Sequence, residues 1–252
     1  MKFALAYKPD PPDPRDKPFA LVREKLAAKP AAGASVFALP QTTGVSEQDQ
    51  NDCAANAGCD AFELLSPDPV QLSRRSCYFL ARLIDGDECK NEGTYVRSVM
   101  KTFSGPGVCR ESLWPYSSDV FTRPSLEALE DGYDHRISGY YRITTRGHAR
   151  GDDIETALRA GHPVVFGTEV GKNFPDYDEG ESVVWQYPDR SVGGHAMVIV
   201  GVRRNDDGTR DFLVRNSWGD AWGLRSRPGH AWFSERYVWE ITDLWVPTQE
   251  WS

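Results

Sequence analysis

The sequence predicts an α+β fold of two subdomains, a helical one followed by one rich in antiparallel strands, with a cleft between them. Three observations predict it. Three blocks within residues 53–103 carry apolar side chains at three- and four-residue spacing, which is typical of helices. After residue 133, three short runs of β-branched and aromatic residues are typical of strands. Turn signals such as Asn205-Asp206-Asp207-Gly208 separate these runs, so neighbouring strands are expected to pair antiparallel.

Residues 1–40 form a proline-rich segment, which we call the N-terminal strap. Proline fixes φ and lacks an amide donor, so the strap is expected to be extended on the surface, with one short helix around residues 21–28. We expect the strap to pack on the second subdomain and to influence access to the cleft. Its prolines are Pro9, Pro11, Pro12, Pro14, Pro18, Pro30 and Pro40.

Residues 41–130 are expected to form the helical subdomain. A first helix from Cys53 to Leu65 follows Asn51 and Asp52, either of which can cap a helix N-terminus. A second and a third helix are expected over residues 72–84 and 92–103. The first helix is rich in small side chains, which implies close packing at the centre of the subdomain; they are Ala54, Ala55, Ala57, Gly58 and Ala61.

Residues 131–252 are expected to form the β-rich subdomain. Asp152 and Asp153 are placed to cap a short helix that runs to Ala160, and Gly161 stops it. Strands are expected over residues 164–166, 196–202 and 212–214.

Composition and charge exclude several classes of protein. The chain is 40% hydrophobic and 26% charged, as in ordinary soluble globular proteins. Its net charge is −8 and no Lys/Arg-rich run interrupts it, so nucleic acid and anionic membranes are poor partners. No apolar run approaches the roughly 18 residues of a membrane span, and Lys8 and Asp10 interrupt the short N-terminal one. We therefore expect a cytoplasmic protein, with export by another route left open.

The chain has five cysteines, an odd number, so at least one thiol stays free in a monomer. None of them forms a C-x-x-C pair, and the spacing of structural zinc ligands is absent. We therefore expect no metal. Whether Cys77, Cys89 and Cys109 form a disulfide stays open.

Cys53 is the candidate nucleophile. A thiol is a strong nucleophile as thiolate, which a helix N-terminus and a neighbouring imidazolium both favour. Cys53 is expected at the first helical position, and His195 is presented by Gly193-Gly194 at the start of an apolar strand. Asn216 follows the next strand and can fix the imidazole tautomer, while Trp218 covers that hydrogen bond from water.

A donor to the developing oxyanion is expected just upstream of the nucleophile. Gln48 can serve together with the Cys53 backbone amide, and Gln50 is the alternative.

These residues, in this order, resemble the papain-type (C1) cysteine peptidases. The resemblance rests on Gln48, on Cys53-Ala54-Ala55-Asn56-Ala57, on Gly193-Gly194-His195-Ala196 and on Asn216-Ser217-Trp218-Gly219-Asp220-Ala221-Trp222-Gly223. His195 lies 142 residues after Cys53, within the roughly 130–150 typical of papain and the cathepsins.

The resemblance implies the papain-like two-subdomain fold, with a helical left subdomain, a β-rich right subdomain and the active-site cleft between them. It also implies thiol-dependent hydrolysis of peptide or protein substrates through an acyl thioester, without a cofactor. Catalysis would use Cys53, His195, Asn216 and Gln48. Substrate contacts would involve Gly93, Gly194 and Trp218, and the proline-rich start is similar to bacterial or phage-type members that lack a long prodomain.

Three departures from the family pattern stand out. Gln48 lies five residues before Cys53, one fewer than usual. Asp52 replaces a small serine, and its carboxylate should raise the pKa of the adjacent thiol. No inhibitory prodomain of the usual length precedes the catalytic region. Two alternatives therefore stay open: an acyl transferase or transpeptidase that uses the same thioester, and an inactive binding module on this fold.

Overall fold

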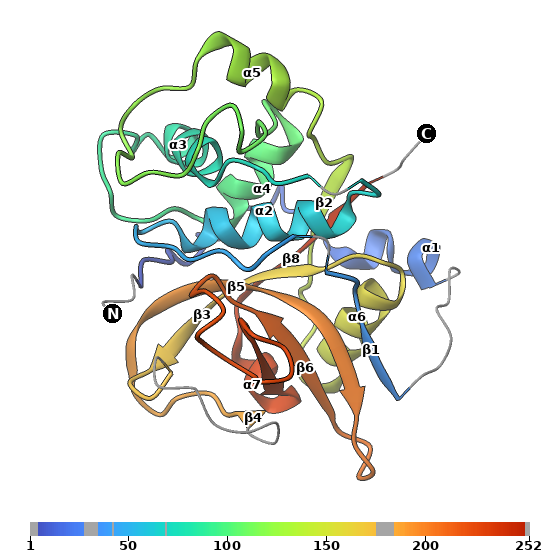
Figure 1. Cartoon of the computed structure of the whole chain (residues 1–252). Helices are drawn as coiled ribbons and strands as arrows, with labels where there is room; N and C mark the ends of the chain where they lie inside the picture. The colour runs from blue at the N-terminus through green and yellow to red at the C-terminus, as the bar shows by residue number, and fades with distance from the viewer. Residues whose placement is uncertain (1–4, 28–34, 42, 69, 175–183, 250–252) are drawn as a thin grey trace.

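The chain folds into a helical half and a sheet-containing half, which confirms the predicted α+β class (Figure 1). The computed structural model describes residues 5–27, 35–41, 43–68, 70–174 and 184–249. The helical half contains α2 (Cys53–Leu65), α3 (Arg74–Asp85), α4 (Val96–Ser104) and α5 (Leu126–Gly132). In the described residues, no helix combines the length and apolar character that crossing a lipid bilayer requires.

The sheet contains eight strands in the order β2-β8-β3-β5-β6-β7-β4, with β1 paired to β5. The predicted strands are present and pair antiparallel, β3 with β5 and β5 with β6; only β4 and β7, among the described pairs, run parallel. The bounds are β1 (Val36–Ala38), β2 (Gly139–Arg142), β3 (Val164–Gly171), β4 (Val184–Trp185), β5 (Ser191–Arg204), β6 (Arg210–Arg215), β7 (His230–Ser234) and β8 (Asp243–Thr248).

Helix α2 lies between the sheet on one side and α3 and α4 on the other (Figure 1). Its small side chains allow this close packing. A Cβ added at Gly58 would lie 2.2 Å from Cγ1 of Val99 in α4, so nothing larger than glycine fits there without a shift. The prediction that the nucleophile helix is central is confirmed, because twelve of its thirteen residues are buried.

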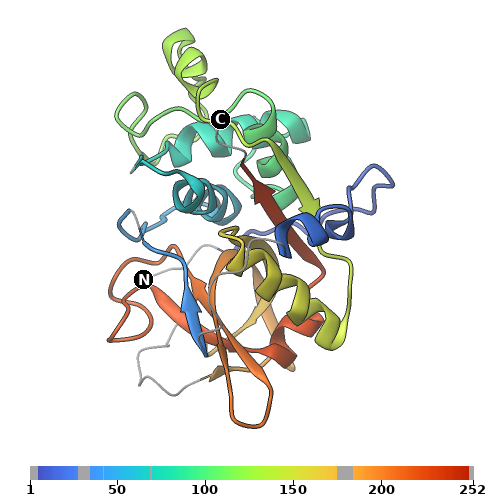
Figure 2. The same ribbon diagram turned by 90° about the vertical axis from the view of Figure 1, so that its right-hand side faces the viewer.

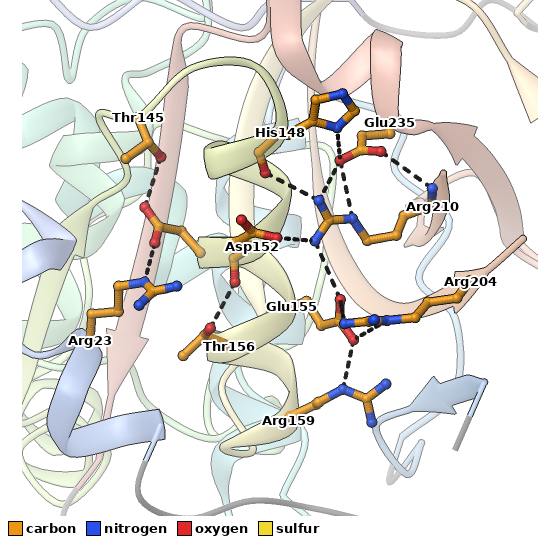
Figure 3. A network of polar contacts seen from close by, with 11 residues as sticks. Arg23, Thr145, His148, Asp152, Glu155, Thr156, Arg159, Arg204, Arg210 and Glu235 are labelled. Carbon is orange, nitrogen blue, oxygen red and sulfur yellow. Dashed lines mark hydrogen bonds and ion pairs between the residues drawn. The ribbon is translucent and has the colours of Figure 1, made fainter. Parts of the chain in front are cut away.

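The predicted start of the helix at residues 152–160 is wrong. Helix α6 (Gly147–Arg159) begins five residues earlier, and Asp152 and Asp153 lie inside it. Their carboxylates bind arginines instead of capping: Asp152 pairs with Arg210 at 2.6 Å and Asp153 with Arg23 at 2.6 Å (Figure 3).

The third predicted helix also begins later than expected. Helix α4 starts at Val96, and residues 92–95 are not helical. Gly93 has a φ of +84°, a conformation that glycine adopts without steric cost, so the chain turns here before the helix begins.

The strap ends in strand β1, and its short helical part consists of η1 (Phe19–Leu21) and α1 (Arg23–Ala27). Helix α1 lies beside α6 (Figure 2). The earlier part of the strap contacts both halves, since Lys8 pairs with Asp87 of the loop after α3 at 3.1 Å, and the Asp10 carboxylate accepts a hydrogen bond from Trp245 of β8 at 2.7 Å.

Candidate active site

Cys53 is the first residue of α2, as predicted, and its side chain is fully buried. Its sulfur accepts hydrogen bonds from the backbone amides of Ala196, Ala6 and Ala54. Ala196 lies on β5 directly after His195, and Ala6 belongs to the strap. The fold therefore brings the predicted nucleophile from one half against the histidine strand of the other.

Burial raises the pKa of the Cys53 thiol to about 11. The amides of Ala196 and Ala6 lower this pKa and the Asp52 carboxylate raises it, as expected from the sequence. With the strap in place, the thiol is therefore protonated at neutral pH.

His195 and Asn216 are joined by the register of two neighbouring strands. Val198 of β5 pairs with Arg215 of β6 in an antiparallel register. His195, which precedes Val198, and Asn216, which follows Arg215, therefore lie at the same end of the two strands. Nε2 of His195 lies 2.7 Å from Oδ1 of Asn216, the contact that the sequence predicts. Nδ1 is buried and has no hydrogen-bond partner among the described residues, so it is left for proton exchange. Burial lowers the pKa of His195 to about 4, and the bond to Asn216 opposes this shift.

An aromatic cluster covers the imidazole from water. The Trp218 ring lies 4.7 Å from the His195 ring, centroid to centroid, and is buried. Phe174 packs edge-on against His195 at 6.2 Å, and its carbonyl accepts a hydrogen bond from Trp222 at 3.1 Å. The sequence identified Trp218 as the cover but missed Phe174, which follows β3 without any motif. A substrate contact by Trp218 stays a prediction.

Gln48 is held on the segment that carries Asn216. Its Oε1 accepts a hydrogen bond from the Ser217 hydroxyl at 2.5 Å, and its backbone amide donates to the Ser217 carbonyl at 2.8 Å. Nε2 of Gln48 donates to the carbonyl of Gln50 at 3.0 Å. The Gln50 side chain instead accepts from Asn91 at 2.9 Å. Gln48 as the side-chain donor to the oxyanion, with Gln50 as the alternative, stays a prediction.

Asp52 occupies the N-cap position of α2, but its side chain does not cap the helix. The carboxyl group hydrogen-bonds with Tyr116 instead, and the Tyr116 hydroxyl also accepts the Asp49 amide at 3.1 Å. Burial raises the pKa of Asp52 to about 6. Of the two candidate caps in the sequence, Asp52 therefore takes the N-cap position, but its carboxyl group does not cap the helix because it bonds to Tyr116, 64 positions later.

Gly93 and Gly194, two of the predicted substrate contacts, lie on either side of the strap. A Cβ at Gly93 would lie 1.7 Å from the carbonyl oxygen of Ala6. The carbonyl of Gly194 accepts a hydrogen bond from the Tyr7 amide at 3.1 Å. The strap backbone therefore passes between these glycines, in contact with the sulfur of Cys53.

All five cysteines are free thiols, and Cys89 is exposed while the others are buried. Among the described residues, no three His, Cys, Asp or Glu side chains gather in a way that would hold a metal ion. The chemistry that the site offers is that of a thiol beside an amide-oriented imidazole.

A family model described as "Papain family cysteine protease" matches residues 76–229. The chain is 30% identical over 230 residues to "Uncharacterized peptidase C1-like protein L477" of Acanthamoeba polyphaga mimivirus, covering 84% of this chain and 71% of that protein. It is 27% identical to "Cysteine endopeptidase RepA" of Oryza sativa subsp. japonica, covering 73% of this chain but only 47% of the rice protein.

Xylellain, a cysteine protease from Xylella fastidiosa, has a similar structure, with a TM-score of 0.78 and 25% identity over 98% of this chain and 97% of that one. Bromelain from Ananas comosus in complex with E64, at 20% identity and a TM-score of 0.66, shares the fold. These similarities confirm the resemblance seen in the sequence, and the chain belongs to the papain family of cysteine proteases.

Proposed function

We propose that this cysteine peptidase cleaves peptide bonds of peptide or protein substrates with Cys53 as nucleophile, His195 as general base and Asn216 as the residue that orients the imidazole. The observation that carries this proposal is the hydrogen bond of 2.7 Å between His195 and Asn216. The residue after His195 on the same strand, Ala196, donates its backbone amide to the Cys53 sulfur, so the imidazole and the thiol belong to one site.

The reaction begins when Nδ1 of His195 takes the thiol proton of Cys53. The thiolate attacks the substrate carbonyl carbon, a C–S bond forms, and the carbonyl electron pair moves onto oxygen. The Cys53 amide, which has no intrahelical acceptor at the start of α2, and the Gln48 carboxamide donate to this oxyanion.

The imidazolium then gives its proton to the leaving nitrogen as the C–N bond breaks, which leaves an acyl thioester on Cys53. His195 next takes a proton from water, and the resulting hydroxide attacks the thioester. The C–S bond breaks, the acid product leaves, and the thiol is restored.

A peptide epoxide tests this assignment in the full chain. We expect mass spectrometry to find the epoxide on Cys53, and Cys53→Ala to abolish both labelling and peptide cleavage. Cys89→Ala is the matched control, because Cys89 is the exposed thiol and its loss should leave both unchanged. Full peptidase activity in Cys53→Ala would show that another group is the nucleophile.

A further inference from the structure

The segment before Cys53 connects the two groups that the proposed function assigns to the oxyanion. The Gln48 carboxamide lies at its start, and the Cys53 amide directly follows its end. We call residues 48–52 the nucleophile loop. This loop belongs to no helix or strand, so contacts with side chains from elsewhere in the fold have to fix its conformation.

Tyr116 holds the nucleophile loop at two points. Its hydroxyl accepts the backbone amide of Asp49 at 3.1 Å and donates to the carboxyl group of Asp52. Tyr116 lies between α4 and α5, and its own backbone amide donates to the Glu111 carboxylate at 2.5 Å. One phenol therefore ties both the second and the last residue of the loop to the helical half.

Asn91 holds the two residues between these points. Its Nδ2 donates to Oε1 of Gln50 at 2.9 Å, and its backbone carbonyl accepts a hydrogen bond from Nδ2 of Asn51 at 2.6 Å. Oδ1 of Asn91 in turn accepts the hydroxyl of Tyr78, a fully buried residue of α3, at 2.9 Å. The loop is thus attached to the helical half through a side chain that α3 itself fixes.

The contacts at Asp52 fix the peptide unit that contains the Cys53 amide. A peptide bond is planar, so the Asp52 carbonyl and the Cys53 amide turn together. This carbonyl accepts hydrogen bonds from the backbone amide of Asn56 at 3.0 Å and from its Nδ2 at 3.2 Å. The carboxyl group of the same residue is held by Tyr116, so Asp52 is bound at both ends.

The backbone of Asp52 differs from that of the capping residues whose side chains bind their helix. Ser73 before α3 and Ser125 before α5 are extended, and each accepts a backbone amide of its helix. Asp52 has φ −110° and ψ 22°, and its carboxyl group makes no such bond. The contact with Tyr116 therefore accompanies a different orientation of the peptide unit before the helix.

We propose that Tyr116 and Asn91 are positioning residues for the reaction, which hold the nucleophile loop so that its oxyanion donors are in place before substrate binds. The inference rests on the proposed function, which supplies the nucleophile and the donors. Donors that are already in place cost no reorganisation when charge develops on the carbonyl oxygen. Loss of one such donor lowers kcat by about a hundredfold to a thousandfold, so a loosened loop should cost about tenfold to hundredfold.

The first experiment measures peptide cleavage by full-length Tyr116→Phe, which loses the hydroxyl and keeps the ring. We expect kcat to fall by about tenfold to hundredfold and KM to stay within about threefold, because the affected interaction forms only in the transition state. Asn91→Ala should lower kcat in the same way. Tyr133→Phe is the matched control, because it makes the same change at a side chain that is 59% exposed, and should leave kcat unchanged.

The second experiment separates positioning from any change in the thiol. A peptide aldehyde with the acyl sequence of the cleaved substrate adds to Cys53: the C–S bond forms, the thiol proton passes to His195, and the carbonyl electron pair moves onto oxygen. The corresponding primary alcohol has no carbonyl and forms no such bond. In Tyr116→Phe we expect the inhibition constant of the aldehyde to rise by about tenfold to hundredfold, and that of the alcohol by less than about threefold.

Alkylation by iodoacetamide provides a further readout. The Cys53 sulfur displaces iodide from carbon and no oxyanion forms, so the rate in Tyr116→Phe should stay within about threefold of the wild type. Equal losses in alkylation, aldehyde affinity and alcohol affinity, together with a lower midpoint of thermal unfolding, would show that Tyr116 only supports the fold and would overturn the proposal.

Two variants of Asp52 test the bond to Tyr116 directly. Asn keeps an acceptor for the phenol, whereas Ala removes it, so we expect Asp52→Asn to bind the aldehyde about ten times more tightly than Asp52→Ala. Equal affinities would contradict the role of this bond.

The outcomes for the two levels of the proposal differ. Cys53-dependent cleavage with wild-type kcat in both Tyr116→Phe and Asn91→Ala would refute the positioning role alone. Cleavage that does not depend on Cys53 would refute the proposed function and the positioning role with it.

Discussion

At the scale of single residues, burial keeps both Cys53 and His195 uncharged while the strap is in place. The pKa of the thiol is raised to about 11 and that of the imidazole is lowered to about 4, both mainly by burial. A thiolate–imidazolium pair therefore forms most readily once water or substrate replaces Ala6 at the sulfur.

The lowered pKa of His195 predicts a loss of stability in acid. The unfolded chain binds a proton at this ring below about pH 6.5, whereas the folded chain binds it only below about pH 4. Stability from this group is thus complete above pH 6.5 and falls as the pH drops through that window, by about 3 kcal/mol in total. Urea unfolding of the wild type and of His195→Gln at pH 7 and pH 4.5 measures it. We expect the wild type to lose more of its free energy of unfolding than the variant; an equal loss would mean that His195 is not buried in solution.

Asn216 is expected to act by orientation, so its removal should cost less activity than removal of the base. We expect Asn216→Ala to lower kcat by about tenfold to hundredfold and His195→Ala by at least about a thousandfold, measured with one peptide substrate. An equal loss in both variants would indicate that Asn216 has a further role in the proton transfer.

At the scale of elements, the strap lies against both halves of the fold beside the nucleophile, and its control of access to Cys53 stays a prediction. Tyr7 links it to the sheet through the Gly194 carbonyl and Asp243, and Lys8 links it to the helical half. The sequence expectation that the strap packs on the second subdomain is therefore too narrow, because the strap contacts both halves next to Cys53.

Loss of the Tyr7 contacts should open the site. In Tyr7→Ala we expect the rate of Cys53 alkylation by iodoacetamide at pH 7, followed by mass spectrometry, to rise at least about tenfold, because water then reaches the sulfur and lowers the thiol pKa. Arg15→Ala is the control on the same strap, since that side chain is 83% exposed and pairs with Asp13. An unchanged rate in Tyr7→Ala would show that the strap does not limit access.

Local patterns in the sequence predict the elements of this fold, and tertiary partners explain the errors. The apolar run after His195 identifies β5, and the small residues after Cys53 identify α2. The start of α6 was misplaced because Asp152 resembles a helix cap but binds Arg210, 58 residues later.

In the candidate site, too, local patterns predict some residues and tertiary contacts determine the others. Cys53, His195 and Asn216 are found by motif and spacing, whereas the contact between Tyr7 and Asp243 joins residues 236 positions apart. No local pattern can indicate such a pair, because only the folded sheet brings the strap to β8. The proposed division of the chain at residues 40 and 130 likewise remains a prediction.

At the scale of the whole molecule, a buried cluster of charges joins the two halves behind the site. Asp60 of α2 is bound by Arg74 at 2.7 Å and by Arg215 of β6 at 3.1 Å, and all three side chains are buried. Arg215 directly precedes Asn216, and Asp60 lies two turns after Cys53 on the same helix. The ion pair therefore fixes the helix of the nucleophile to the strand that carries the orienting amide.

Asp60→Asn should weaken both stability and activity because it leaves two buried guanidinium groups with one carboxylate fewer. We expect a loss of about 3–5 kcal/mol in the free energy of unfolding by urea, with little dependence on salt, and a lower kcat under conditions where the variant is folded. Lys90→Met is the control, since it breaks an exposed ion pair with Asp87 and should leave both quantities unchanged. Wild-type kcat in folded Asp60→Asn would show that the two halves keep Cys53 and Asn216 in place without this ion pair.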